Sequence, residues 1–169
     1  MDRVERAINK VLQPTLAAQG FALNKEWGYF VRKQPYGFDA FTVVNQGTAK
    51  GRFFEIKCYA EVRHDRIEVP WNTLGMVFGE DNQLQTWTLL YKGRADPKLP
   101  VLKVNPESMA ADMEHVAREI AEFFTQQAQA FYQRFGDLSA VEEWVNKTPL
   151  AELNPSAGGP MGHRAMRAL

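Results

Sequence analysis

The residues best suited to acid–base chemistry gather at the end of one regularly patterned segment. This segment, KGRFFEIKCYAEVRH, spans residues 50–64, and Glu61, Arg63, His64 and Asp65 lie at its end or directly after it. A histidine beside a carboxylate can act as an oriented general base. Neighbouring side chains of a strand point to opposite faces, however, so His64 and Asp65 are not expected to meet. We interpret the cluster as a polar strand end, and a small enzyme with a site near His64 remains an alternative function.

The sequence holds no spacing typical of a metal or cofactor site. His64, His115 and His163 are far apart, and the single cysteine, Cys58, falls among residues expected in the core. No Cys-x-x-Cys, His-x-x-x-His or His-Glu-x-x-His motif occurs. The glycines lie in turns between predicted strands, and none opens a helix as a phosphate-binding loop requires. We therefore expect no metal, no cofactor, no catalytic residue and no internal disulfide.

Two sets of side chains alternate along residues 53–63. One set is apolar and is expected to pack on a helix: Phe54, Ile56, Cys58, Ala60 and Val62. The other set mixes aromatic and charged residues and is expected to be solvent-exposed: Phe53, Glu55, Lys57, Tyr59, Glu61 and Arg63. Aromatic residues beside arginine are typical of protein interfaces, and alternating charges suit a partner of mixed sign. We predict that these six residues bind a partner protein.

Nucleic acid is a less favoured partner for the same face. The string at residues 50–54, KGRFF, resembles the start of an RNA-recognition motif. That motif needs aromatic residues on alternate positions, whereas Phe53 and Phe54 are adjacent and only one of them can be exposed. Glu55 and Glu61 would also repel phosphate groups. Nucleic-acid binding is therefore kept as an alternative function.

The first 63 residues predict a helix and then a meander of strands. Apolar residues recur three or four positions apart over 2–19, with Asp2 as N-cap and Gly20 after the last turn. Pro14 is expected to kink this helix or divide it in two. Strands are predicted at 21–25, 28–33, 38–45 and 52–63, antiparallel because the connections are short. The strand at 38–45 is apolar on both faces and is expected to be central.

The rest of the chain predicts an irregular segment, two more strands and two helices. Residues 64–83 are expected to be irregular, with strands at 84–91 and 100–104. A long helix is predicted over 106–135 with Asn105 as N-cap, and a second helix follows from a capping box that begins at Ser139. Residues 1–150 are thus expected to form one α+β domain: an antiparallel sheet of about five strands, flanked by an N-terminal helix and two C-terminal helices. Residues 151–169 are expected to be a flexible tail.

The composition indicates a globular protein of balanced charge. The chain has 169 residues, 45% hydrophobic and 24% charged, and its 20 basic residues equal its 20 acidic ones. A dedicated nucleic-acid-binding protein usually has a basic excess. The net charge still varies along the chain, from +4 over residues 1–63 to −5 over 104–147. This pattern fits two solvated faces of opposite sign, or a polarised surface that steers a charged partner.

No targeting or membrane signal is expected to direct the chain out of the cytoplasm. The N-terminal stretch, MDRVERAINKVLQ, has mixed charge and lacks the apolar region of a secretory signal. No apolar run approaches the length of a membrane span. We expect a cytoplasmic protein without membrane contact, and the sequence leaves its oligomeric state open.

Two parts of the chain resemble a broad bacterial family of uncharacterised small α+β proteins, a domain of unknown function. The resemblance lies in Leu-Gln-Pro-Thr-Leu at residues 12–16, Gly20-Phe21, Tyr29-Phe30-Val31-Arg32 and the segment LSAVEEW at 138–144. It covers about residues 8–63 and 105–147. Some small proteins of this kind resemble immunity proteins, which bind and block bacterial toxins. The resemblance therefore implies a non-enzymatic protein-binding module, of the type of an immunity inhibitor.

Overall fold

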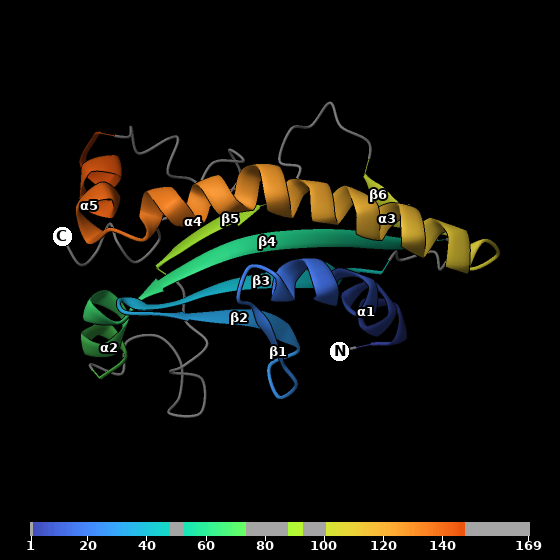
Figure 1. Cartoon of the computed structure of the whole chain (residues 1–169), viewed down its shortest axis with the longest axis horizontal. Helices are drawn as coiled ribbons and strands as arrows, with labels where there is room; N and C mark the ends of the chain where they lie inside the picture. The colour runs from blue at the N-terminus through green and yellow to red at the C-terminus, as the bar shows by residue number, and fades with distance from the viewer. Residues whose placement is uncertain (1, 48–52, 74–87, 93–100, 148–169) are drawn as a thin grey trace.

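The computed structural model describes residues 2–47, 53–73, 88–92 and 101–147, which form an α+β fold (Figure 1). In chain order the elements are α1 (Arg3–Ala17), β1 (Ala22–Asn24), β2 (Tyr29–Gln34), β3 (Gly37–Asn45), β4 (Phe54–His64), α2 (Asp65–Thr73), β5 (Leu89–Lys92), β6 (Leu102–Val104), α3 (Met109–Phe123), η2 (Phe124–Ala128), α4 (Gln129–Phe135) and α5 (Leu138–Lys147). Helices α3, η2 and α4 form one rod that runs along β4, and α2 lies where β4 ends (Figure 1). The predicted fold class is confirmed. No helix in the described part is long and apolar enough to cross a membrane.

The described strands form one antiparallel sheet in the order β1-β2-β3-β4-β5, and β6 pairs with β4 beside β5. Strand β3 lies between β2 and β4, so its predicted central position is confirmed. Strand β4 pairs with β5 through Tyr59–Val62 and with β6 through Phe54–Ile56. Each predicted strand lies within a few residues of an observed one, although residues 84–87 of the strand predicted at 84–91 lie outside the described residues.

Helix α1 begins with the predicted cap at Asp2. The Asp2 carboxylate accepts from the Glu5 backbone N–H and the Glu5 carboxylate accepts from the Asp2 N–H, both at 2.8 Å, which is a complete capping box. Pro14 was expected to kink the helix or to divide it in two, and the second of these outcomes is wrong, because Arg3–Ala17 is one helix. Pro14 removes a hydrogen bond to the carbonyl of Lys10, and both residues are exposed, so water can solvate that carbonyl.

Helix α2 replaces part of a segment that was predicted to be irregular. It spans Asp65–Thr73, while residues 74–83 lie outside the described residues. Two carboxylates, Asp65 and Glu68, stand in its first turn, where the helix dipole favours negative charge. The glycines that argue against a helix begin only at residue 75. The prediction therefore extended the irregular segment too far towards β4.

The long helical rod contains a π-helical turn, η2, in its middle. Pairs of buried residues mark the side of the rod that faces the sheet: Val116 with Ala117, Phe123 with Phe124, and Phe131 with Tyr132. The first two pairs are seven residues apart, as in an α-helix, and the next two are eight apart. The wider turn of a π-helix accommodates that additional residue. The apolar side thus stays on the sheet over the whole rod.

Two predicted helix caps are wrong. Asn105 does not cap α3, which begins four residues later, and its Oδ1 accepts from the Glu107 N–H within a turn. Helix α5 begins at Leu138, before the predicted cap Ser139. Asp137 takes the capping role, since its Oδ1 accepts from the Ser139 N–H at 3.0 Å.

The core lies between the sheet and the helices α1 and α3–α4. Its aromatic centre joins the sheet to the rod: Phe41 meets Phe124 edge-on with ring centroids 5.1 Å apart, and Phe21 meets Phe124 at 5.4 Å. Cys58 is buried here, as predicted. The alternation of β4 is also confirmed on this side, with Ile56, Cys58, Ala60 and Val62 buried and Phe54 packed partly against them.

A buried carboxylate, Asp39, connects the sheet to the helices. It is 0% exposed and accepts from Arg32 Nε (3.0 Å) and Nη2 (2.8 Å), Gln34 Nε2 (2.8 Å) and Tyr36 Oη (2.6 Å). The Arg32 guanidinium lies over the ring of Phe21 at 4.6 Å. Its Nη1 also donates to the carbonyl of Gln19 after α1. One carboxylate thus fixes β2, β3 and the end of α1 relative to one another.

Substitution Asp39→Asn should destabilise the fold strongly. The new amide nitrogen would face the donors of Arg32 or Gln34, leaving a buried donor or charge without its acceptor. We expect the free energy of unfolding to fall by about 3 kcal/mol, measured by urea denaturation. The matched control is Glu143→Gln, which breaks the exposed Glu143–Lys147 pair and should change little. Equal effects of the two substitutions would contradict the role of Asp39.

Gly37 permits the tight turn between β2 and β3. Its φ is +146°, and a Cβ built there would lie 2.3 Å from the carbonyl oxygen of Arg63 on β4. The substitution Gly37→Ala should therefore cost about 3 kcal/mol. Gly47→Ala is the control, since Gly47 has φ +61° with nothing within 4 Å, and it should cost only about 1 kcal/mol. Chemical denaturation of both variants tests the difference, and a similar loss in both would show that the close approach to Arg63 is unimportant.

Candidate functional site

The candidate site is the outer face of the sheet, defined as the face that points away from α1 and α3–α4. The strand register places several sets of side chains on it: Tyr29, Val31 and Lys33 from β2; Phe38, Ala40, Thr42 and Val44 from β3; Lys57, Tyr59, Glu61 and Arg63 from β4; and Leu90 from β5. Phe53 and Glu55 continue the same alternation at the start of β4. All six residues predicted to bind a partner therefore belong to one face.

The outer face is more buried than predicted at one end. Glu61 is only 4% exposed and Arg63 only 2%, so the expectation that they are exposed is wrong. Phe53, Glu55, Lys57 and Tyr59 are half-buried. The accessible part of the predicted set is thus its first four members.

Contacts on two sides keep the Arg63 side chain buried, although it lies on the outer face. Its Nε donates to Asp65 Oδ1 at 2.7 Å, at the start of α2, and its guanidinium lies over the ring of Phe38 at 5.6 Å. Residues 64–83 were expected to be irregular, so the sequence grouped Arg63 with Asp65 at the strand end but did not predict that α2 would bury Arg63. The alternation itself was correct, whereas the exposure was not.

Glu61 is buried beside hydroxyl groups. Thr42 Oγ1 donates to Glu61 Oε2 at 2.6 Å across the β3–β4 pair. Burial raises the pKa of Glu61 to about 8, and the Thr42 hydrogen bond opposes this shift. Burial also raises the pKa of Tyr59, and the negative charge of Glu61 adds to that effect. The carboxyl group of Glu61 is therefore largely protonated at neutral pH.

An aromatic cluster that the sequence analysis missed lies beside these charges. Trp27 packs on Tyr29 and on Phe38, with ring centroids 5.5 Å and 5.9 Å apart. Trp27 stands in the turn before β2, where Asn24 Oδ1 accepts from the Trp27 N–H at 3.1 Å. The sequence did contain a signal for this cluster. Trp27 lies between Asn24 and Gly28 in a turn, where small polar residues are usual and a large aromatic residue is unexpected.

Charges of both signs flank a second aromatic residue at the other end of the face. Lys103 Nζ lies 4.3 Å from the ring centroid of Phe53, and Lys57 Nζ lies 3.2 Å from Glu55 Oε1. The side chains of Lys57 and Glu55 are 24% and 27% exposed, so water or a partner can reach them. The outer face thus combines two aromatic groups with paired, accessible charges.

His64, the alternative catalytic residue, lies on the opposite side of the sheet. It is buried, its Nε2 donates to the carbonyl oxygen of Phe135 at 2.7 Å, and its ring stacks on Tyr36 at 4.7 Å. Burial lowers its pKa, which the hydrogen bond to Phe135 partly offsets. A histidine in this position ties α4 to β4 and is not placed to meet a substrate from solvent.

The described residues contain no group of three or more His, Cys, Asp and Glu that could hold a metal ion. Chemically, the outer face offers rings for packing, the hydroxyl groups of Tyr29, Thr42 and Tyr59, and paired charges. The chain was compared with protein-family models, curated proteins and solved structures, and nothing matched it in any of the three.

The buried Glu61 should make stability depend on pH. The carboxyl group titrates near pH 4.5 when unfolded and near 8 when folded, so between these values the folded state holds a proton that the unfolded state has released. The free energy of unfolding should therefore fall as the pH rises through this window. Glu61→Gln cannot ionise and still accepts from Thr42, so the fall should be much smaller in this variant. Urea denaturation at about pH 5, 7 and 9 measures it.

Two comparisons make this test specific. Burial lowers the pKa of His64, which affects stability in the opposite direction below neutral pH, but it does so equally in wild type and variant. Glu55→Gln removes a carboxylate of the same face that is partly exposed, and it should keep the wild-type slope. If Glu61→Gln retains the full pH dependence, Glu61 is not the group responsible.

Proposed function

We propose that the chain is a non-enzymatic protein-binding module that recognises a partner protein through the outer face of its sheet. The observation that carries the proposal is the set of aromatic residues along this face: Phe53 beside Lys103 at one end, half-buried Tyr59 on β4, and Trp27 packed on Tyr29 and Phe38 at the other end. Aromatic side chains fixed by their neighbours provide contact area at little cost in conformational entropy. Because these side chains are already held in place, the face can bind a partner without rearranging first.

The charges indicate the chemistry of the partner surface. Lys33, Lys57 and Lys103 provide positive charge on this face, while Glu55 provides a negative charge that is already paired with Lys57. A partner surface with both acidic and polar groups fits this arrangement better than a polyanion does. An immunity-type inhibitor, which binds an enzyme and blocks its active site, is the role that fits this kind of partner and the family resemblance of the sequence.

The two alternative functions are less well supported. The histidine that could have formed an active site is buried on the other side of the sheet and bonded to Phe135. A nucleic acid would meet Glu55 next to the rings on which its bases would have to stack, and phosphate groups would be repelled there. The experiment below separates a protein partner from a nucleic acid.

The proposal is tested by capture and then by measured affinity. The full chain is immobilised, lysate of the source cells is passed over it with and without nuclease treatment, and the retained protein is produced separately for calorimetric titration. We expect the double variant Phe53→Ala/Tyr59→Ala to weaken binding by at least about tenfold, since hot-spot aromatics each contribute about 2 kcal/mol. Both side chains are only half-buried, so the variant should remain folded by circular dichroism.

The matched control is Arg118→Ala, a residue on α3 whose side chain is 69% exposed, away from the outer face. It should bind the partner like the wild type. Equal affinity of the double variant and the wild type would reject the outer face as the binding site. Retention that disappears after nuclease treatment, with salt-sensitive binding to RNA or DNA, would favour the nucleic-acid alternative.

A further inference from the structure

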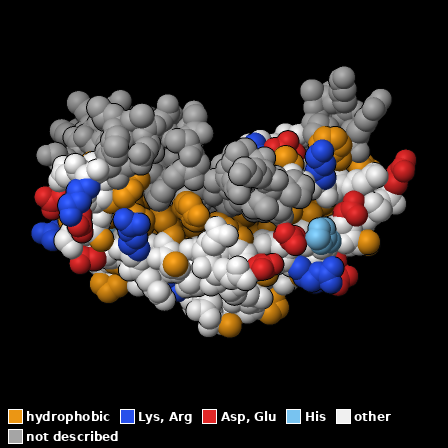
Figure 2. Space-filling view, turned by 90° about the horizontal axis from the view of Figure 1, so that it is seen from above, with side chains coloured by type: hydrophobic (Ala, Val, Ile, Leu, Met, Phe, Trp, Pro, Cys, Tyr) orange, Lys and Arg blue, Asp and Glu red, His pale blue; other side chains and the backbone are white. Residues whose placement is uncertain are grey.

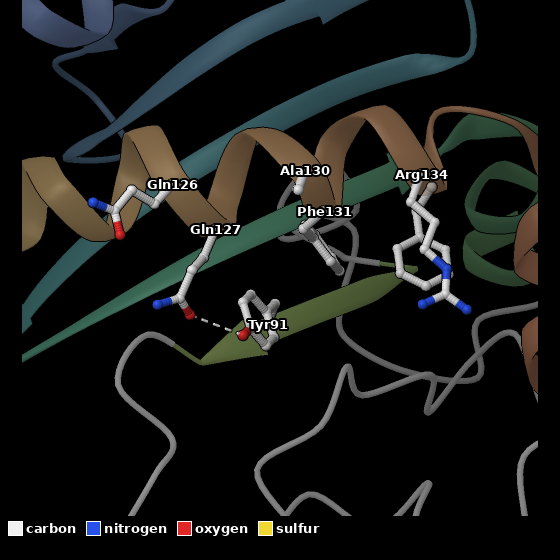
Figure 3. A pocket seen from close by; sticks show the side chains of 7 residues that line it. Tyr91, Gln126, Gln127, Ala130, Phe131 and Arg134 are labelled. Atoms are coloured by element: carbon white, nitrogen blue, oxygen red, sulfur yellow. Dashed lines mark hydrogen bonds between the residues drawn. The ribbon is translucent and has the colours of Figure 1, made fainter. Parts of the chain in front are cut away.

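A groove lies on the helical side of the molecule, between β5 and the rod formed by η2 and α4. Its volume is about 400 Å³, and it is lined by Tyr91, Gln126, Gln127, Ala130, Phe131, Arg134 and Phe135 (Figure 3). In Figure 2, which looks down on the side along which the rod runs, apolar side chains reach the surface in the middle and charged ones gather towards the two ends. The groove belongs to neither the outer face nor the Asp39 network.

The groove has an aromatic wall in which Tyr91 is half-buried and Phe131, behind it, is only 5% exposed. The rings of Tyr91 and Phe131 stack with centroids 5.5 Å apart and an interplanar angle of 21°. Tyr91 also packs on Phe123 at 5.8 Å, and Phe131 on Phe135 at 5.2 Å, so the wall is fixed from behind by the core. A planar apolar ligand group can pack on such a surface without reorganising it.

The polar groups of the groove stand at its two ends. Figure 3 shows Tyr91 and Phe131 between Gln127 at one end and Arg134 at the other. Tyr91 Oη donates to Gln127 Oε1 at 3.1 Å, which holds both side chains in place. Arg134 is exposed, lies over the ring of Phe135 at 4.9 Å and forms no ion pair with any residue in the described ranges. The groove therefore presents one cation beside an aromatic wall.

The π-helical turn shapes this groove. Gln126 and Gln127 both belong to η2, whose extra residue sets Gln127 beside Tyr91 while the buried side of the rod stays on the sheet. Such turns are often found at functional sites, because they cost stability and are retained where a side chain must be repositioned. Here the turn holds the amide end of the groove.

Nearby carboxylates limit the charge that a ligand can carry. Glu122 accepts from Gln126 Nε2 at 2.9 Å at the amide end. The hydrogen bond from Lys147 lowers the pKa of Glu143, and the nearby Arg134 adds to this shift to a smaller extent. A polyanion would be repelled at both ends. A ligand with one negative charge on an apolar body complements the groove.

We propose that this groove binds a small aromatic carboxylate, with its ring against Tyr91, which Phe131 supports from behind, and its carboxylate on Arg134. A volume of about 400 Å³ is within the range of small-molecule sites and accommodates a bicyclic acid. The open shape and single cation predict modest affinity. This site is independent of the proposed protein-binding face, so the chain could bind a small ligand and a protein at the same time.

The test uses 2-naphthoate and its neutral counterpart, 2-naphthamide, as probes with the full chain. Binding is followed by amide chemical shifts in NMR spectra, which also show where the probe lies. Wild type should bind naphthoate at least about fivefold more tightly than naphthamide, because only the acid pairs with Arg134. Shifts should centre on the residues of β5, η2 and α4. In Arg134→Gln this preference should disappear, while naphthamide binds as before.

Two further variants make the result specific. Arg118→Gln removes another exposed arginine from α3, on the same rod, and should keep the preference for the acid. Ala130→Trp places a large side chain in the groove from an exposed helical position and should abolish binding of both probes. The proposal is overturned if wild type binds neither probe or binds both equally. It is also overturned if Arg118→Gln loses the preference as Arg134→Gln does.

Discussion

The fold depends on the hydrogen bonds that the buried carboxylate of Asp39 accepts. A carboxylate without solvent contact is costly unless several donors surround it, and here Arg32, Gln34 and Tyr36 all donate to it. Its main partner, Arg32, lies against the aromatic rings of both Phe21 and Tyr132. Tyr132 in turn donates to the carbonyl of Ala40 at 2.6 Å, next to Asp39 in β3. The hairpin β2–β3, the end of α1 and the helical rod are thereby fixed in one arrangement, and both candidate sites are built on it.

Most of the fold could be predicted from periodicity. Alternation along β4 and the three- and four-residue spacing in α1 and the rod report directly which side chains face the core. Local signals that compete with one another were less reliable. Asn105 and Ser139 are good capping residues in isolation, but the N-cap position of α3 is Ser108 and the cap of α5 is Asp137, three residues and two residues away from them. The π-helical turn was visible only as a change in the spacing of apolar pairs from seven to eight residues.

The candidate sites were harder to predict, because they depend on contacts between distant segments. The sequence correctly grouped Phe53, Glu55, Lys57 and Tyr59 with Glu61 and Arg63 on one face, but it could not show that Asp65 and Phe38 draw Arg63 inward. Trp27 joins that face only because the β1–β2 turn folds over Tyr29. The groove unites β5 with residues about 40 positions later in the chain, and no local pattern links Tyr91 to Arg134.

The two short strands beside β4 have a consequence for how the protein behaves at high concentration. An eleven-residue strand with a bare edge would be a template on which other chains could add strands and aggregate. Strands β5 and β6 cover that edge in two pieces, leaving only Lys57 and Cys58 between them. At the far side the sheet ends in β1, which has just three residues and offers little backbone for another chain to pair with. Both edges of the described sheet are thus protected from pairing with strands of other chains.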